Sequence, residues 1–204
     1  MINSILFDLG NVLLPLDIQA TYNAFKKLGA RPTLHKDLEF FHHWERGEIG
    51  SDLFFEEIKT HLKYKTNSLS ILEAWNKMLL PFPHDTLRLL KQLKSSYKLI
   101  LISNINHEHE KAIKKLMGPF YYSQLLKQFS GIYYSHHVGM RKPEQNFFRK
   151  VIDESDLVPS ETLFVDDTEE NIVCAENLGF KTWHFNPITD DILNLPSVIK
   201  KITK

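Results

Sequence analysis

The chain has 204 residues, of which 43% are hydrophobic, 12% aromatic and 25% charged. This composition can form a buried core, so it excludes disordered, collagen-like and low-complexity chains. Lys plus Arg and Asp plus Glu number 25 each, which leaves no overall basic field for nucleic acid or an anionic membrane surface. The single cysteine, Cys174, can form no internal disulfide.

Apolar runs such as 99–102 fall far short of the ~20 residues that a membrane-spanning helix needs. The first residues carry neither a basic start nor a small-residue cleavage site, so no signal peptide is predicted. We therefore expect a soluble cytoplasmic protein, a monomer or homodimer, with no nucleic-acid or membrane partner.

Strands and helices are predicted to alternate along most of the chain. Short, unalternated apolar runs indicate strands buried on both faces, at 4–7, 98–102, 131–135, 162–165 and 181–185. Helical spacing is found between them, at 85–94, 108–117, from Pro143 onward, and at 169–178 before Gly179. This order predicts an α/β fold, a Rossmann-like, doubly wound parallel sheet.

The segment between the first two strands breaks this alternation. It carries four helical patterns and no strand, at 17–28, 33–44, 51–62 and 68–80. A crossover between parallel strands needs only about a dozen residues. We therefore predict an inserted helical cap at 15–85 over a core formed by 1–14 and 86–204.

Candidate catalytic and binding residues follow the predicted strands. They are Asp8 after the first strand, Ser103-Asn104 after the second, Lys142 before a helix near the third, and Asp166-Asp167 after the fourth. Ligands bind beyond the carboxyl ends of strands in such sheets. Each residue alone is ordinary turn or capping chemistry. Together they supply a carboxylate nucleophile, a hydroxyl, a fixed ammonium and a cradle for a divalent metal, as phosphoryl transfer through an aspartyl phosphate requires.

With these motifs in this order, the chain resembles the haloacid dehalogenase-like hydrolase superfamily, and the inserted helices resemble that family's small cap. Within the family it is similar to bacterial sugar-phosphate phosphatases of the glucose-1-phosphate phosphatase type. The segments that carry this likeness are 7–12, 45–49, 140–144 and 166–167.

The resemblance implies a Mg²⁺-dependent phosphatase that hydrolyses a small phosphorylated metabolite, plausibly a sugar phosphate. It makes Asp8 the nucleophile, and it places Mg²⁺ between Asp8, the carbonyl of Gly10 and Asp167, with Asp166 beside it. Ser103, Asn104 and Lys142 are then expected to bind the phosphoryl group, with Lys142 also stabilising the transition state.

Gly10 departs from the family pattern, because phosphatases of this family usually carry a second aspartate there as general acid. Such help is typically worth ~10²–10⁴-fold. In one interpretation, Asp17, His42 or His43 substitutes for it. In a second, the leaving group is good enough to depart unprotonated, as an anomeric sugar oxygen is. In a third, the protein is a non-catalytic binding protein of this fold.

The same glycine is compatible with a metal-independent 2-haloacid dehalogenase, because halide leaves without a proton. That reaction needs no Asp166-Asp167 pair, so the pair favours a phosphatase. In the cap, His43 and Arg46 are candidate substrate contacts, and Trp44 and Arg46 also fit ordinary packing and capping. We expect His136 and His137 to lie on a strand, pointing to opposite faces, with a surface role.

Overall fold

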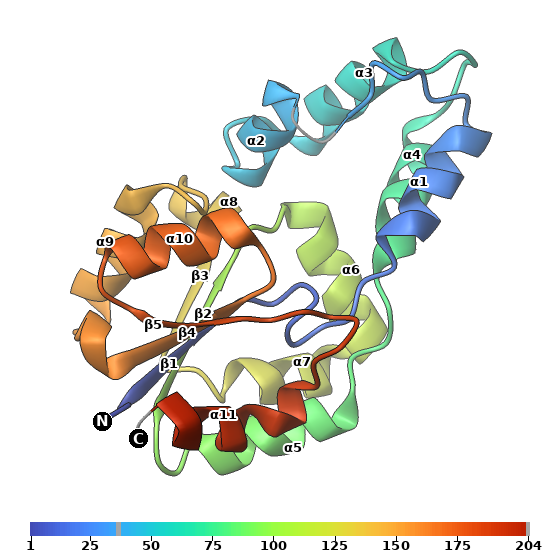
Figure 1. Ribbon diagram of the computed structural model, residues 1–204. Coiled ribbons are helices and arrows are strands. Elements are labelled where there is room, and N and C mark those ends of the chain that lie inside the picture. Colours follow the sequence, from blue (N-terminus) through green and yellow to red (C-terminus); the bar gives the residue numbers. More distant parts are fainter. Residues whose placement is uncertain (36–37, 203–204) are drawn as a thin grey trace.

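The computed structural model describes residues 1–35 and 38–202, and it contains one parallel sheet (Figure 1). The strand order is β3-β2-β1-β4-β5, which confirms the predicted α/β architecture. The strands are β1 (Ser4–Phe7), β2 (Lys98–Ser103), β3 (Gly131–Tyr134), β4 (Thr162–Asp166) and β5 (Lys181–His184).

Helices cover both faces of this sheet (Figure 1). One face packs on α5 (His84–Leu93), α6 (His107–Met117), α7 (Pro119–Leu126) and α11 (Leu195–Ile202). The other packs on α9 (Gln145–Glu154) and α10 (Glu169–Asn177). The short α8 (Ser135–Val138) follows β3, and single 3₁₀ turns lie at Asn76–Met78, Pro159–Glu161 and Ile192–Asn194.

The inner strands β1, β2 and β4 are mostly apolar because helices cover both faces of the sheet. In β1, Ile5 and Phe7 belong to the cluster on one face, and Leu6 belongs to the cluster on the other. All three side chains are fully buried. Alternating Cβ directions thus give each helical layer its own set of strand residues, which explains why these runs do not alternate between polar and apolar residues.

The segment between β1 and β2 contains α1 (Ile18–Lys27), α2 (Glu39–Glu45), α3 (Ser51–Thr60) and α4 (Ser68–Trp75). These helices have an aromatic core of their own, in which Trp44 stacks on Phe54 with ring centroids 3.5 Å apart. In Figure 1 they project from the sheet beside the ends of β1 and β2. A separate core supports the predicted inserted domain, whose exact limits remain a prediction.

Two predicted helix starts are wrong. The helix expected at 33–44 begins at Glu39, because Arg31–Leu34 forms a turn closed by Leu34 N–H and Arg31 C=O, with Pro32 at a position that favours turns. Residues 36–37 of that predicted helix lie outside the described residues. The helix expected from Pro143 begins at Gln145, because Arg141–Glu144 forms another turn, closed by Glu144 N–H and Arg141 C=O.

Two ion pairs connect the inserted helices to the core. Arg46 at the end of α2 donates to Glu144 at 2.8 Å, and Arg141 donates to Glu45 at 2.8 Å. The two pairs run in opposite directions, since each side contributes one arginine and one glutamate. They hold the end of α2 above the turn that carries Lys142.

No helix within the described ranges combines the length and apolar character that a membrane crossing requires.

Candidate active site

Three strands bring the predicted residues to one edge of the sheet. Asp8 directly follows β1, Ser103 ends β2 and Asp166 ends β4. Because β1 lies between β2 and β4, the three residues occupy neighbouring strand ends. All three are buried. The parallel topology therefore places the predicted nucleophile at the centre of the group.

Lys142 joins two of these carboxylates. Its side chain is 1% exposed, and its Nζ donates to Asp8 Oδ1 at 2.7 Å and to Asp166 Oδ2 at 2.6 Å. The backbone of Lys142 is held in turn by the side chain of Asn104. Asn104 Oδ1 accepts from Lys142 N–H and Asn104 Nδ2 donates to Lys142 C=O, both at 2.8 Å.

Asn104 thus has a positioning role that the sequence did not predict. Both ends of its amide are engaged by the Lys142 backbone, so its predicted contact with a phosphoryl group would fall to its main chain. That contact stays a prediction, as does that of Ser103, which is 3% exposed.

The two adjacent aspartates are held by different groups. Asp166 accepts from Asn171 Nδ2 at 3.0 Å and from Thr168 N–H at 2.8 Å. Asp167 accepts from Asn11 Nδ2 at 2.7 Å. Asn11 stands in the motif segment 7–12 and Asn171 follows the aspartate pair, but residue type alone gave no signal that their amides orient the two carboxylates. Asn11 adopts φ 58°, a left-handed conformation that asparagine tolerates better than most residues.

The electrostatics of this group favour a bound cation. The pKa of Asp8 is raised to about 7, chiefly by burial, with Lys142 opposing the increase and Asp166 and Asp167 adding to it. Burial by itself would lower the pKa of Lys142, yet Asp166 and Asp8 raise it overall. Lys142 is therefore the charged partner in a cluster where negative groups outnumber positive ones.

The residues also fit a magnesium ion chemically. Asp8, Asp166 and Asp167 each offer a carboxylate oxygen, and these oxygens lie within 4.8 Å of one another. Mg²⁺ prefers oxygen ligands and is usually held by one or two carboxylates, with water completing its shell. The Gly10 carbonyl accepts Val12 N–H at 2.7 Å, which leaves its second lone pair for the predicted contact.

The other candidates for acid or substrate contact are engaged elsewhere. Asp17 is the N-cap of α1, where its Oδ1 accepts Ala20 N–H at 2.9 Å. His43 pairs with Glu48 and lies 3.5 Å from Glu39. Arg46 binds Glu144, as described above. Their predicted roles toward a substrate stay predictions, and each would require an existing contact to break.

The predicted strand placement of His136 and His137 is wrong, whereas the predicted surface position holds for His137, whose side chain is 57% exposed. Both lie on α8, not on a strand, and their ring centroids are 4.1 Å apart. The side chain of His136 is only 5% exposed. The chain leaves β3 one residue earlier than expected, and the helical turn that follows brings both rings to one side.

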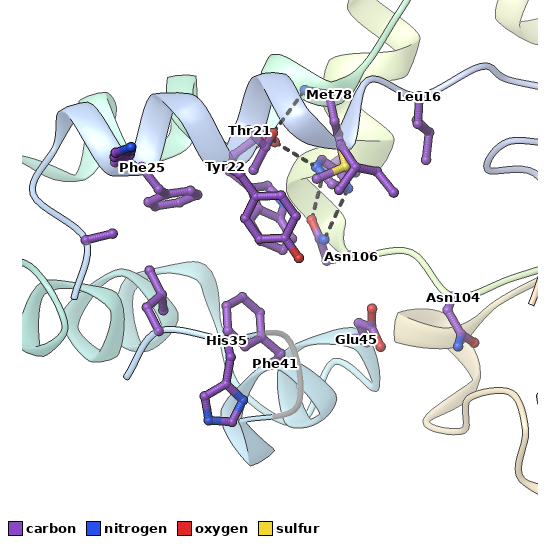
Figure 2. A pocket seen from close by; sticks show the side chains of 16 residues that line it. Leu16, Thr21, Tyr22, Phe25, His35, Phe41, Glu45, Met78, Asn104 and Asn106 are labelled. Atoms are coloured by element: carbon purple, nitrogen blue, oxygen red, sulfur yellow. Dashed lines mark hydrogen bonds between the residues drawn. The ribbon is translucent and has the colours of Figure 1, made fainter. Parts of the chain in front are cut away.

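A mostly apolar cavity of about 530 Å³ has in its lining Asn104, the residue that holds the Lys142 backbone (Figure 2). It lies between α1 and α2, and Figure 2 shows Leu16 and Asn104 at one end and Phe25 toward the other. A Cβ on Gly10 would lie 3.1 Å from Leu16 Cδ1 and 3.9 Å from Asp8 Oδ2, so Leu16 connects the cavity to the nucleophile. The sequence did not predict this cavity.

The cavity lining is mostly hydrophobic, and several of its polar atoms are already paired. The hydroxyl of Thr21 donates toward the carbonyls of Ala74 and Trp75 and accepts Met78 N–H at 3.0 Å. His109 stacks on Trp75 with centroids 5.0 Å apart, and burial lowers its pKa to about 4. His109 therefore contributes a neutral ring at pH 7.

A model of haloacid dehalogenase-like hydrolases matches residues 2–179. The chain belongs to this family. It is accordingly a hydrolase, and the predicted superfamily is confirmed.

Relatives of known activity cover nearly the whole chain. The chain is 29% identical over 191 residues to a D-ribitol-5-phosphate phosphatase of Bacteroides thetaiotaomicron, covering 90% of this chain and 91% of that protein. It is 27% identical to the sesquiterpene phosphatase astK of Aspergillus oryzae, covering 92% of this chain and 90% of that one.

Solved structures give the same family. The family enzyme bt-2542 of Bacteroides thetaiotaomicron, in complex with magnesium and inorganic phosphate, is similar with a TM-score of 0.84 and 31% identity, covering 96% of this chain and 99% of that one. The L-2-haloacid dehalogenase of Xanthobacter autotrophicus has a TM-score of 0.59 and 20% identity over 89% of this chain and 76% of that one, which shows a shared fold alone.

The buried position of Lys142 leads to a stability prediction. Lys142→Met should lower the free energy of unfolding by about 3–5 kcal/mol, because it leaves buried carboxylates without their cation. Urea denaturation at pH 7 followed by circular dichroism measures this. Lys150→Met, which removes an exposed lysine from α9, should leave the unfolding midpoint nearly unchanged. Equal midpoints for the two variants would contradict a charge-balancing role for Lys142.

Proposed function

We propose that this hydrolase is a Mg²⁺-dependent phosphatase of a small phosphomonoester, acting through an aspartyl phosphate on Asp8. The observation that carries the proposal is the contact of Asp8 with the buried ammonium of Lys142 at 2.7 Å, beside two further carboxylates. The phosphatase relatives and the magnesium and phosphate complexes of a similar structure support it.

The chain's own residues account for the two chemical steps. Asp8 attacks phosphorus, a bond forms between its carboxylate oxygen and phosphorus, and the bond to the alcohol oxygen breaks. Water then attacks the acyl phosphate, releases inorganic phosphate and regenerates the carboxylate. Lys142 keeps Asp8 oriented and counters the negative charge that develops on the phosphoryl oxygens. Magnesium, held by Asp8, Asp167 and the Gly10 carbonyl, neutralises the repulsion between carboxylate and phosphate when bound.

Two alternatives receive less support. A metal-independent dehalogenase would have no use for the carboxylates of Asp166 and Asp167 within 4.8 Å of Asp8. A non-catalytic binding protein would not require a nucleophile aligned with a buried lysine. The first experiment separates all three.

Asp8→Asn should abolish phosphate release from p-nitrophenyl phosphate in the presence of Mg²⁺, because an amide cannot attack phosphorus. Asp153→Asn, on α9 and remote from the strand ends, serves as the matched control and should retain wild-type turnover. EDTA should also abolish phosphate release by the wild-type protein. Undiminished turnover by Asp8→Asn excludes the mechanism, halide release from a 2-haloacid with EDTA present supports the dehalogenase, and no turnover of any phosphate supports the binding protein.

The glycine at position 10 gives a second prediction. Its φ lies outside the left-handed region, and an added Cβ would press only on the flexible end of Leu16. Gly10→Asp should therefore fold and supply the missing general acid. We expect turnover of an alkyl phosphate, a poor leaving group, to rise by up to ~10²–10⁴-fold, with little gain for p-nitrophenyl phosphate. Gly10→Asn has nearly the same size without the acid. An equal effect of the two substitutions on alkyl phosphate hydrolysis would contradict this explanation.

The cavity bears on the choice of substrate. The ribitol-phosphate relative supports a sugar phosphate or sugar-alcohol phosphate, as the sequence led us to expect. Most of the lining supports an apolar alcohol, because Leu16, Phe25 and Phe41 offer no hydrogen bonds and Thr21 is already paired. Lys26, His35 and Glu45 also line the cavity, so the apolar surface is bordered by polar groups. A buried hydroxyl left unpaired costs about 1–3 kcal/mol. Of the two, we propose the phosphate of an apolar alcohol, with its chain in the cavity.

A homologous series tests this choice. Each buried methylene contributes about 0.8 kcal/mol, or roughly fourfold in kcat/KM. Hydrolysis of n-alkyl phosphates from butyl to octyl should accordingly rise about fourfold per carbon, and the longer esters should exceed ribitol 5-phosphate and glucose 1-phosphate. A flat series, with the polyol phosphates hydrolysed faster, would establish the sugar class.

A further inference from the structure

A second group of metal-ligating side chains lies apart from the catalytic carboxylates. His107 and Glu110 on α6 and His136 on α8 each offer one ligand atom, and these atoms lie within 4.8 Å of one another. Two imidazoles and a carboxylate form a mixed nitrogen and oxygen donor set. None of the three residues has a part in the mechanism above.

The hydrogen bonds of His136 leave one ring nitrogen for a cation. Its Nδ1 lies 2.7 Å from the carbonyl of Ile105, which can only accept, so Nδ1 carries a proton. In a neutral ring Nε2 is then an unprotonated lone pair, and it faces Glu110 Oε2 at 3.0 Å. Two acceptors at this distance repel each other unless a proton or a metal cation is shared between them.

Other imidazole rings lie near the same glutamate. His107 is the third member of the group, and His137 Nε2 also lies 3.3 Å from Glu110 Oε2. A single proton satisfies one such pair, whereas a metal ion binds several lone pairs at once. The number of converging donors therefore favours a metal ion over a simple ion pair.

Hydrogen bonds from neighbouring residues orient His136 and Glu110, as is usual for metal-binding side chains. Metal-binding histidines usually donate the second ring N–H to a carbonyl or carboxylate, and ligating carboxylates are themselves hydrogen-bonded. Here His136 donates to Ile105, and Tyr122 donates to the other oxygen of Glu110 at 3.2 Å. Tyr134 lies 3.3 Å from the Tyr122 hydroxyl and extends the network. The side chains of His136 and Glu110 are thus each held in orientation by a hydrogen bond to a neighbouring residue.

We propose that His107, Glu110 and His136 bind a divalent transition-metal ion of the Zn²⁺ class. Imidazole suits zinc, cobalt and nickel, whereas Mg²⁺ prefers oxygen donors, so the two sites differ in metal preference. Three protein ligands leave at least one coordination position for water or His137.

The position of this site gives the bound ion a structural consequence. The proposed site connects α6 to α8. The helical insertion rests on α8, because α2 contacts α8. The two segments lie so close that a Cβ on Gly47 would be only 2.4 Å from the His136 carbonyl oxygen. The metal fixes the surface of the core against which the insertion packs. Binding should therefore raise the thermal stability of the protein.

Cobalt spectroscopy tests the proposal with the full chain. Co²⁺ is titrated into the protein in a large excess of Mg²⁺, which fills the catalytic carboxylates. We expect one equivalent to bind with visible absorption bands typical of imidazole ligation, and Zn²⁺ to displace it and raise the melting temperature. His136→Gln and His107→Gln should abolish both signals, and Tyr122→Phe should weaken binding by roughly 10–100-fold.

His84→Gln, which removes a histidine of α5 outside the group, is the matched control and should bind as the wild type does. Circular dichroism checks that each variant is folded. Absence of Co²⁺ and Zn²⁺ binding overturns the proposal and leaves an ion pair. Binding that survives in His136→Gln and His107→Gln but is lost in Asp167→Asn also overturns it, because the ion then sits at the catalytic carboxylates.

Discussion

The ammonium of Lys142 is buried between two carboxylates, and the arrangement of the active edge depends on this contact. Asp8 and Asp166 come from neighbouring strands, and an unpaired charge at either position would be expensive to bury. Lys142 reaches them from a turn, not from a strand, so its backbone needs independent support. Asn104, at the end of β2, supplies that support with both ends of its amide. Four segments distant in sequence are thereby linked through one side chain.

That single positive charge does not balance the cluster, and the imbalance connects the fold to the chemistry. Burial and its acidic neighbours raise the pKa of Asp8 to about 7. A nucleophile must be ionised, so the site works best when a further cation is present. A divalent ion meets this need and also screens the incoming phosphate. Asn171 and Asn11 hold the carboxylates of Asp166 and Asp167, whose oxygens lie within 4.8 Å of each other and of one from Asp8.

The sequence predicted the parts of the site that depend on strand ends, and it failed where short-range geometry decides. Asp8, Ser103 and Asp166 follow apolar runs that can only be buried strands, so their convergence follows from topology. The role of Asn104 depends on which way an amide points after a strand, which composition does not encode. The error at His136 arose because one residue decides whether the chain leaves β3 as a strand or as a helical turn. Spacing likewise gave no sign of the apolar cavity, since its walls come from α1, α2 and α4.

The absence of an acid at Gly10 and the character of the cavity belong to one question, which is how the alcohol leaves. The side chain of Leu16 lies beside Gly10 and also lines the cavity, so the same residue borders the leaving oxygen and the alcohol. An aspartate at position 10 would project a carboxyl group toward this apolar wall. The opposed ion pairs of Arg46 and Arg141 hold α2 over the same entrance. Under the proposed function, the departure of the alcohol thus depends on the same segment that shapes the cavity, and Gly10 itself offers no side chain to protonate the leaving oxygen.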